Sequence, residues 1–309
     1  MKILFVRIND KIGDTVIETF FYRELKRLNP TAHLTVMCCG NQAILKEIPY
    51  IDKLILLPPR GLLKIAVAFA KIPLLWKQKY DLLISFTPHW RMKIFNALVR
   101  APRKECFDFI PGAHVSEAYR RVLTHLGARK IDTSYELPIP VQARNAVDTF
   151  LTQQGLNGKS FLFFNPAGGA PSRTLSVARV REITDGISNL PLVLADLHGC
   201  YKIQKKNVFS FACNDIWQTA ELVRRCTYVL TVDTSISHIA QTFDKPITVL
   251  FSLKNYPNEP AKDVSLLTAW GPCGRAVQRL WAAQSVNDIS PEKIISAIFE
   301  GWSHVSTHP

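Results

Sequence analysis

The feature that most constrains this chain is an alternation of short apolar runs, rich in β-branched residues, with amphipathic stretches of helix length. Buried parallel strands form near-continuous apolar runs, and the connections between parallel strands are usually helices. The alternation therefore predicts an α/β fold with parallel sheets. In the first half of the chain we expect strands at Ile3–Ile8, His33–Cys38, Lys53–Leu57, Asp81–Phe86 and Lys104–Phe107.

A second series of the same kind follows a proline-punctuated segment, IDTSYELPIP, at residues 131–140. Two series of similar size in 309 residues predict two Rossmann-like domains whose parallel sheets face each other across a cleft. We expect the domains at 1–145 and 146–290, with a closing helix at 291–309 packing back toward the first domain. The strands of the second series are expected at Phe161–Asn165, Leu190–Ala195, Val208–Phe211, Tyr228–Val232 and Ile247–Phe251.

Composition and charge narrow the classes of function. The sequence has no uncharged apolar run of about 18 residues, and MKILFVRI is too short for a signal peptide, so we expect a cytoplasmic protein without a transmembrane helix. Seven cysteines without a CxxC spacing are expected to be reduced core residues. A net charge of +13 favours an anionic partner. The sequence has no RNP motif and no zinc-finger spacing, so nothing except the charge supports nucleic-acid binding.

Residues 60–79, RGLLKIAVAFAKIPLLWKQK, allow two interpretations. Lys64 and Lys71 fall on one helical face among apolar residues, and a basic amphipathic helix can lie in an anionic membrane interface. The alternative is a crossover helix packed on the sheet with its lysines in water, because a strand follows at once. Both remain open from the sequence.

The opening stretch, NDKIGDTVIETFFYRELKRL at residues 9–28, places a carboxylate at the end of the first strand. Gly13 is expected to allow a sharp turn, followed by a helix at Thr15–Leu28. Asp14 then either caps this helix, where a carboxylate interacts well with the helix dipole, or serves as a general base that faces the cleft.

A second polar segment, NPAGGAPSRT, follows the strand at Phe161–Asn165. The pair Gly168-Gly169 would let backbone amides approach a ligand, and Arg173 would supply a fixed cation for phosphate oxygens. The segment lacks the GK[ST] of a Walker A loop, so it is either a phosphate-binding loop of another kind or an ordinary glycine turn.

A third segment, VDTSISH at residues 232–238, also joins a strand to a helix. Hydroxyl groups and backbone N–H groups gather there in a pattern that is typical of an anion site, and the acid can accept hydrogen bonds from sugar hydroxyls. The absence of a DxD pair predicts no metal clamp, and the absence of GxGxxG argues against a dinucleotide oxidoreductase. The candidate donor-binding residues are Gly168, Gly169, Arg173, Asp233, Thr234, Ser235, Ser237 and His238.

Together, these segments resemble the heptosyltransferase family of bacterial glycosyltransferases, glycosyltransferase family 9. The opening, KILFVRINDKIGDTVIETFFYRELKRLNP, is similar to that family's strand, I-G-D and helix. VDTSISHIAQTFDKPITVLFS is similar to its second signature, D-T-G-x-x-H-x-A followed by G-K-P-x-x-x-L-F-G. The order and spacing agree over nearly the whole chain.

The resemblance implies a GT-B fold, with the acceptor bound by the first domain and the nucleotide sugar by the second. It implies transfer of heptose from ADP-heptose, a donor substrate rather than a cofactor, to the inner core of lipopolysaccharide or lipooligosaccharide, with inversion and without a metal. By position Asp14 matches the family's catalytic base, and Asp233 matches the acid that contacts the sugar. His238 matches a histidine near the nucleotide, and Arg173 lies near a lysine that binds the diphosphate.

Departures from the family pattern keep alternatives open. Ser235 stands where glycine is usual, Asp244 replaces the glycine before Lys245-Pro246, and in ADLHGC only Asp196 or His198 suggests a ribose contact. The donor can therefore be another nucleotide-hexose, or the chain can be a catalytically idle nucleotide-sugar-binding assembly protein.

The implied acceptor is phosphorylated and acidic, and it is built at the inner face of an anionic inner membrane. We therefore expect a cytoplasmic protein that is peripheral on that membrane, and no nucleic-acid partner. The expected acceptor contacts are Asn9, Lys11, Gly13, Arg60, His89, Arg91 and Arg120, with Arg7 and Arg121 as further candidates.

Overall fold

The computed structural model describes residues 1–7, 10–58, 63–86, 90–108, 110, 112–213, 215–255, 271–272 and 277–306. It divides into two compact units: unit 1 contains residues 1–138, and unit 2 contains residues 139–264 and 271–309. The boundary therefore precedes the one expected at residue 145. Helix α13 (Pro291–Ser306) contributes Ile294 and Ile298 to the core of unit 2.

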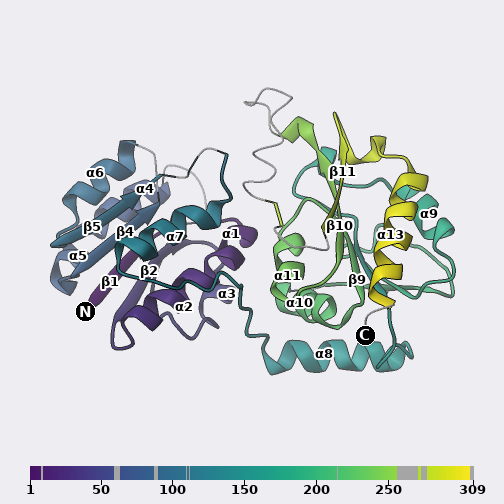
Figure 1. The fold of residues 1–309 in the computed structure, drawn as a ribbon, viewed down its shortest axis with the longest axis horizontal. Coiled ribbons are helices and arrows are strands. Elements are labelled where there is room, and N and C mark those ends of the chain that lie inside the picture. Colours follow the sequence, from purple (N-terminus) through teal and green to yellow (C-terminus); the bar gives the residue numbers. More distant parts are fainter. Residues whose placement is uncertain are drawn as a thin grey trace. The chain divides into compact units, whose positions relative to one another are not determined.

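Unit 1 contains a five-stranded parallel sheet in the order β3-β2-β1-β4-β5 (Figure 1). Strand β1 pairs with β2 on one side and with β4 on the other. The strand order of the sheet therefore reverses between the neighbours β1 and β4. The elements of this unit are β1 (Lys2–Val6), α1 (Ile12–Ile17), α2 (Thr19–Leu28), β2 (His33–Cys39), α3 (Gln42–Leu45), β3 (Lys53–Leu57), α4 (Leu63–Ala70), α5 (Ile72–Gln78), β4 (Leu82–Phe86), α6 (Trp90–Leu98), β5 (Arg103–Phe107) and α7 (Val115–His125).

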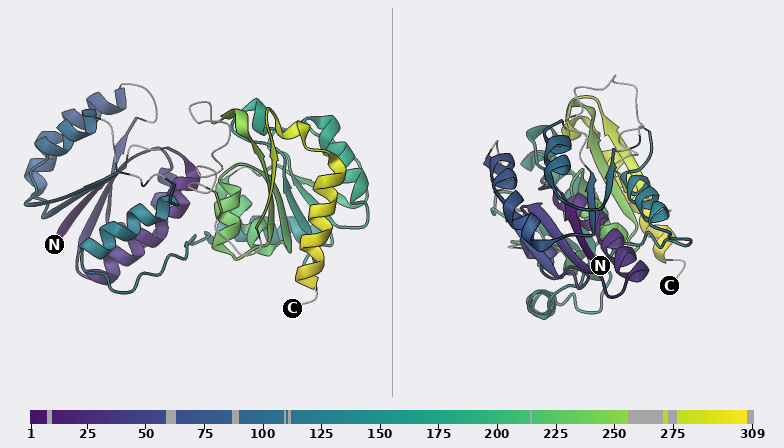
Figure 2. Two further views of the ribbon diagram at one scale, coloured as in Figure 1. Left: turned by 45° about the horizontal axis from the view of Figure 1, so that its top comes forward. Right: turned by 90° about the vertical axis from the view of Figure 1, so that its left-hand side faces the viewer.

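The alternation of side chains along β1 builds one core on each face of this sheet. Leu4 and Val6 pack in a cluster with residues of α4, α5 and α6. Phe5 points to the opposite face, where its ring contacts Phe21 and Tyr22 of α2. Figure 2 shows α4 and α5 in blue on one side of the sheet and α2 and α7 on the other.

Unit 2 contains a six-stranded parallel sheet in the order β11-β10-β9-β6-β7-β8. Counted within the unit, this is the strand order of the Rossmann fold, with its reversal between β6 and β9. The elements are α8 (Val141–Gln153), β6 (Leu162–Asn165), η1 (Pro171–Arg173), α9 (Val177–Gly186), β7 (Leu192–Ala195), β8 (Val208–Phe211), α10 (Ile216–Arg225), β9 (Tyr228–Val232), α11 (Ile236–Thr242), β10 (Ile247–Ser252), η2 (Leu253–Asn255), β11 (Val277–Ala282), η3 (Val286–Asp288) and α13.

All ten strands expected from the sequence are present, with ends within two residues of those expected, and β11 is an additional strand. The helix expected at 60–79 is a pair, α4 and α5. Among the described residues no helix has the length and apolar character needed to cross a membrane. The six described cysteines carry free thiols, and three of them are buried.

Candidate active site

The loop after β1 leads into a helix that begins earlier than the sequence suggested. Helix α1 starts at Ile12, with Lys11 as its N-cap residue, so Gly13 lies inside the helix and does not form a turn before it. Asp14 is the third residue of α1, within its first turn, and its side chain is buried. The expected helix at Thr15–Leu28 is interrupted at Glu18, which separates α1 from α2.

Glu18 is the centre of a buried polar cluster that the sequence did not reveal. The Arg7 Nε lies 2.5 Å from Glu18 Oε2, and the Tyr22 hydroxyl donates to the same oxygen at 2.7 Å. The Tyr119 hydroxyl, from α7, donates to Glu18 Oε1 at 2.9 Å. Because Glu18 and Arg7 are only 2% and 3% exposed, this ion pair is compensated inside the protein rather than by water.

The pKa shifts in this cluster keep Arg7 charged and both tyrosine hydroxyls protonated, so all three side chains can hold Glu18. Burial alone lowers the pKa of Arg7, but the charge of Glu18 outweighs it and keeps the guanidinium ionised. Burial, reinforced by the charge of Glu18, raises the pKa of Tyr22 and of Tyr119, so both phenols remain donors. Arg7 was a candidate acceptor contact; this expectation is wrong, because its side chain is enclosed and engaged with Glu18.

Asp14 lies one helical turn before Glu18, and its environment is different. Burial is the largest cause that raises the pKa of Asp14 to about 7, and the charge of Glu18 raises it further. Lys11 and Arg7 act in the opposite direction, with a small contribution from Asp10 that again raises the pKa. A carboxyl group that titrates near neutral pH is suited to take a proton and release it again.

A loop from the neighbouring strand holds the start of α1 in place. The Asn41 amide, after β2, donates to the Asp10 carbonyl at 2.9 Å and to the Thr15 hydroxyl at 3.0 Å. Gly40 has a φ of 74°, and an added Cβ would lie 3.1 Å from the Asp10 side chain, so a side chain is disfavoured on both grounds. The β2 loop therefore positions the segment that carries Asp14.

The other expected acceptor contacts that the structure describes lie at the start of α1, on α6 and on α7. Lys11 is exposed beside Asp14 at the start of α1. Arg91 lies on α6, with its guanidinium over the Trp90 ring, and Arg120 on α7 pairs with Glu117 at 2.8 Å. Arg121 is exposed on α7. Asn9, Arg60 and His89 lie outside the described residues.

In unit 2 the two predicted loops meet at the point where the strand order reverses. Strands β6 and β9 are neighbours, with Asn165 opposite Thr231. The buried Asn165 amide donates to the Ala167 carbonyl and to the Thr231 hydroxyl, both at 3.0 Å, and lies 3.5 Å from the Thr234 hydroxyl. Asn165 therefore joins the loop after β6 to the turn after β9, at the carboxyl edge where ligands of such sheets bind.

Arg173 and Asp233 form an ion pair across this junction. Arg173 Nη1 lies 3.0 Å from Asp233 Oδ2, and both side chains are partly exposed. An added Cβ on Gly168 would overlap the Arg173 carbonyl oxygen and lie 2.8 Å from its Cβ, whereas one on Gly169 would lie 3.4 Å from Nη2 only. The glycine pair thus provides the surface against which Arg173 packs, so its first role is to position this cation.

The remaining predicted donor contacts divide into two groups. Thr234 and Ser235 are partly exposed in the turn, beside Asp233. Ser237 and His238 are buried, and the Ser237 hydroxyl donates to the Thr234 carbonyl at 2.8 Å, which shapes the turn from inside. Thr174, which the sequence did not single out, accepts from the Gly168 N–H at 3.1 Å and closes the loop after β6.

Asp196, a candidate ribose contact at the end of β7, has a structural task. Its carboxylate accepts from the backbone N–H groups of Cys200 at 2.9 Å and Tyr201 at 3.1 Å, and the side chain is buried. His198 is exposed in the same loop, and Lys254 is exposed in η2, just after β10.

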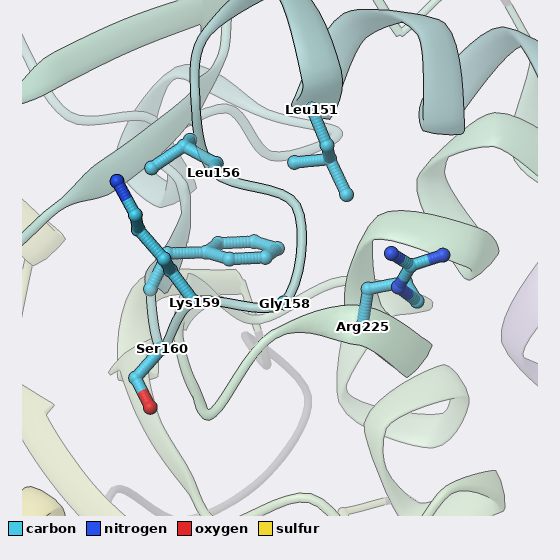
Figure 3. A pocket seen from close by; sticks show the side chains of 7 residues that line it. Leu151, Leu156, Gly158, Lys159, Ser160 and Arg225 are labelled. Carbon is cyan, nitrogen blue, oxygen red and sulfur yellow. The ribbon is translucent and has the colours of Figure 1, made fainter.

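Unit 2 also has a cavity of about 240 Å³. Figure 3 shows the residues that line it. Ser160 and Phe161, which line it, precede β6, so the cavity lies at the amino end of the strand, opposite the edge that carries the two loops. Arg225 also lines it and is already bound to Asp148 at 2.5 Å and to Asn157 at 2.7 Å. Neither its place nor its chemistry connects it with Asp233.

Comparison with known proteins tests the resemblance. No protein-family model matches the chain. It is 20% identical over 321 residues to "Putative lipopolysaccharide heptosyltransferase 4" of Escherichia coli K12, covering 96% of this chain and 85% of that protein.

The chain is also similar to solved structures of glycosyltransferases. The glycosyl transferase family 9 protein of Veillonella parvula has a TM-score of 0.76 at 18% identity, with 98% of this chain and 97% of that chain covered. The ADP-heptose lps heptosyltransferase II of E. coli has a TM-score of 0.71 at 14% identity, with 98% and 99% covered. The E. coli heptosyltransferase WaaC with ADP has a TM-score of 0.70 at 15% identity, with 97% and 100% covered. These likenesses confirm the expected fold, two Rossmann-like units of the GT-B type, and the resemblance to heptosyltransferases.

Proposed function

We propose that this chain is an inverting glycosyltransferase that transfers heptose from ADP-heptose to a sugar of the lipopolysaccharide core, with Asp14 as general base. The proposal is supported by the full-length similarity to heptosyltransferases and by the residues at the carboxyl edges of both sheets. Unit 2 supplies the donor contacts through Arg173, Asp233 and the backbone of their loops. Unit 1 supplies the base and binds the acceptor.

The reaction requires two groups with opposite tasks. Asp14 takes the proton of the acceptor hydroxyl as its oxygen bonds to the anomeric carbon, and the bond from that carbon to the diphosphate breaks on the opposite side. The departing ADP then carries the electron pair of the broken bond. Arg173 offers N–H donors beyond the one used by Asp233, and its guanidinium neutralises the negative charge that develops on the diphosphate. No step in this scheme requires a metal.

The single observation that carries the proposal is the environment of Asp14. A base must be ionised at working pH, yet retain enough basicity to take a proton, which favours a pKa near 7. Burial and the adjacent charge of Glu18 raise the pKa of Asp14 to about 7. Arg7, which would otherwise lower that pKa more strongly, is neutralised by its ion pair with Glu18.

The deciding experiment measures ADP release from ADP-heptose in the presence of a truncated core acceptor. We expect release with the wild-type chain and a loss of about 10²–10⁴-fold in kcat for Asp14→Asn, because general-base help has this magnitude. Asp10→Asn is the matched control, because Asp10 is an exposed acid in the same segment; its rate should remain close to wild type.

Donor identity is tested by the melting temperature, since a ligand that binds only the native state raises it. ADP-heptose and ADP should stabilise the chain more than UDP- or GDP-hexoses. If only another nucleotide sugar stabilises the chain, that nucleotide sugar is the donor instead of ADP-heptose.

Two outcomes of the ADP-release assay would contradict the proposed mechanism. A wild-type rate in Asp14→Asn would rule out Asp14 as the base, and donor binding without any ADP release would indicate the catalytically idle alternative.

A further inference from the structure

Unit 1 exposes an apolar surface on the helices that flank β4. Five of the nine exposed large apolar side chains among the described residues lie on α4, α5 and α6. They are Leu63 (61% exposed), Leu74 (43%), Trp90 (59%), Ile94 (46%) and Leu98 (44%), and we call them the α4–α6 face. On α6 the three residues recur at every fourth position, so they form one continuous row.

The three helices form one surface rather than three separate ones. Phe69 of α4 and Phe95 of α6 pack with ring centroids 5.7 Å apart. The Trp76 indole of α5 donates to the Leu98 carbonyl of α6 at 2.8 Å. Their inner sides share one core cluster through Ala68, Ile72 and Phe95. The α4–α6 face is therefore the outer side of a single packed layer on the unit 1 sheet (Figure 1).

Helix α4 shows that this outer side departs from an ordinary soluble surface. Its sequence, LKIAVAFA, is apolar on every side except at Lys64. A helix that is apolar all round is normally enclosed on all sides, because a surface helix otherwise carries polar residues toward water. Leu63, Ala66 and Ala70 of α4 are nonetheless exposed.

The charge around the α4–α6 face has one sign. Residues 63–100, which span α4, α5 and α6, contain seven lysines and arginines but only one acid, Asp81, which gives this segment a formal charge of +6. Lys77, Lys93 and Arg100 on α5 and α6 or just after them are exposed beside the apolar residues. Arg91 lies with its guanidinium 5.1 Å from the centre of the exposed Trp90 ring.

We propose that the α4–α6 face docks on an anionic phospholipid bilayer, with its apolar residues in the interface and its cations against the headgroups. Lysine and arginine can lay their apolar stems along such a surface while their charges reach phosphate, and tryptophan is enriched at the same depth. Binding of this kind increases with buried apolar area and with attraction to anionic lipids, and this face offers both.

Charge complementarity selects the bilayer over a second copy of this chain. In a two-fold dimer the same patch would face itself and bring its cations together, which is unfavourable. The inference rests on the proposed function in one respect, since a lipopolysaccharide acceptor is itself attached to a membrane. The surface itself is observed independently of the reaction.

Co-sedimentation of the full chain with lipid vesicles tests the proposal. We expect binding to vesicles of mixed phosphatidylcholine and phosphatidylglycerol, and much weaker binding to phosphatidylcholine alone. Raising the ionic strength from about 0.1 M to about 1 M shortens the Debye length from about 10 Å to about 3 Å and should release most of the protein. Leu74→Glu/Ile94→Glu should reduce the partition constant at least about tenfold, because it removes apolar contact and adds repulsion.

Val141→Glu/Leu197→Glu is the matched control, with the same change of charge at two exposed apolar residues of unit 2, and should bind vesicles as wild type does. Equal loss in both variants would overturn the proposal, as would equal binding to both kinds of vesicle. A dimer in ultracentrifugation that only Leu74→Glu/Ile94→Glu dissociates would assign the face to self-association instead. Release of ADP with a soluble acceptor should be unchanged in Leu74→Glu/Ile94→Glu, so failure of docking and failure of the proposed reaction are distinguishable.

Discussion

Asp14 and Glu18 are both buried carboxyl groups, one helical turn apart, and the structure treats them differently. Glu18 is held by Arg7 and by two tyrosine hydroxyls, whereas burial and the Glu18 charge raise the pKa of Asp14 to about 7. The two carboxyl groups therefore have different partners, and the proposal gives them different roles. Glu18 is a positioning residue, and Asp14 is the group proposed to touch the acceptor.

The first prediction concerns the pH dependence of the reaction. Because the base must be deprotonated, kcat/KM should rise with pH up to about 7 and fall about tenfold for each unit below it. Glu18→Gln should shift the acidic limb of this pH–rate profile to lower pH, because it removes a negative charge that raises the pKa of Asp14. The measurement is a pH–rate profile over about pH 5–9.

Glu18→Gln also leaves the Arg7 cation without its partner, which costs about 3–5 kcal/mol of stability when such a pair is buried. Arg7→Gln/Glu18→Gln removes both charges and should return the limb toward that of the wild type, because Arg7 lowers the pKa of Asp14. A limb that stays in place in Glu18→Gln would exclude Glu18 from tuning the base.

The second prediction is a stability change at the same residue. The pKa of Asp14 rises from 3.8 to about 7 on folding, so the folded chain holds this proton more tightly than the unfolded chain. The resulting stabilisation is complete below about pH 4 and is lost as the pH rises through about 7, with a size on the order of 4 kcal/mol.

Asp14→Asn cannot titrate at this position, so it does not lose stability in this way as the pH rises. The free energy of unfolding of Asp14→Asn minus that of wild type should therefore increase between about pH 4 and pH 8. Denaturant unfolding of both proteins across this range measures the difference. A difference that decreases with pH would mean that Asp14 is ionised in the folded chain at low pH, contrary to the raised pKa.

At the scale of an element, the loop after β6 is shaped around Arg173. We predict that Gly168→Ala lowers the affinity for ADP at least about tenfold, or about 1.4 kcal/mol, because the new Cβ displaces the Arg173 backbone. Gly169→Ala is the control within the same pair, since its Cβ would meet only the flexible end of Arg173. Calorimetric titration with ADP compares them; equal affinities would mean that the loop relaxes.

The strands were predictable because each one is an apolar run that local reading can detect. Strand β11 was not, because all six of its residues are only partly buried and it contains polar residues at its centre. Gln278 has a specific partner there, as its Oε1 accepts from the Thr248 hydroxyl at 3.0 Å. Such a strand is recognised only when its neighbour β10 is in place.

The helix interruption at Glu18 escaped prediction for a related reason. The local sequence TVIETFF has no glycine or proline, so it reads as continuous helix. Two of the three partners that hold Glu18 lie outside this stretch: Arg7, before the helix, and Tyr119, 101 residues away on α7. The location of Asp14 in the first helical turn after β1 was predictable from the sequence, whereas Glu18 and Thr174 act through contacts that no spacing rule contains.

At the scale of the whole molecule, the two units contain sheets with the same kind of strand reversal. The strand order is β3-β2-β1-β4-β5 in one unit and β11-β10-β9-β6-β7-β8 in the other. In the proposal, nucleotide binding belongs to unit 2 and proton transfer to unit 1. Substitutions in one unit should therefore leave the other task intact.

This division gives the fourth prediction, read from thermal unfolding with ADP. At about 100 times its dissociation constant, a ligand stabilises the native state by about 2.7 kcal/mol. We expect this stabilisation in wild type and in Asp14→Asn, and its loss in Arg173→Met. Arg181→Met removes an exposed cation from the same unit and should behave as wild type. Loss of the effect in Asp14→Asn would show that the two tasks are not separate.

The charge of unit 1 is gathered in one stretch. Outside residues 53–104, residues 1–138 carry eleven basic and eleven acidic side chains, so the remainder of the unit is neutral. A body charged on one part only has a dipole moment. Within about a Debye length of a negatively charged surface, about 8 Å at physiological ionic strength, the field exerts a torque on that dipole. Unit 1 would then turn before it touches such a surface, with α4, α5 and α6 leading, and a larger share of its collisions would lead to binding.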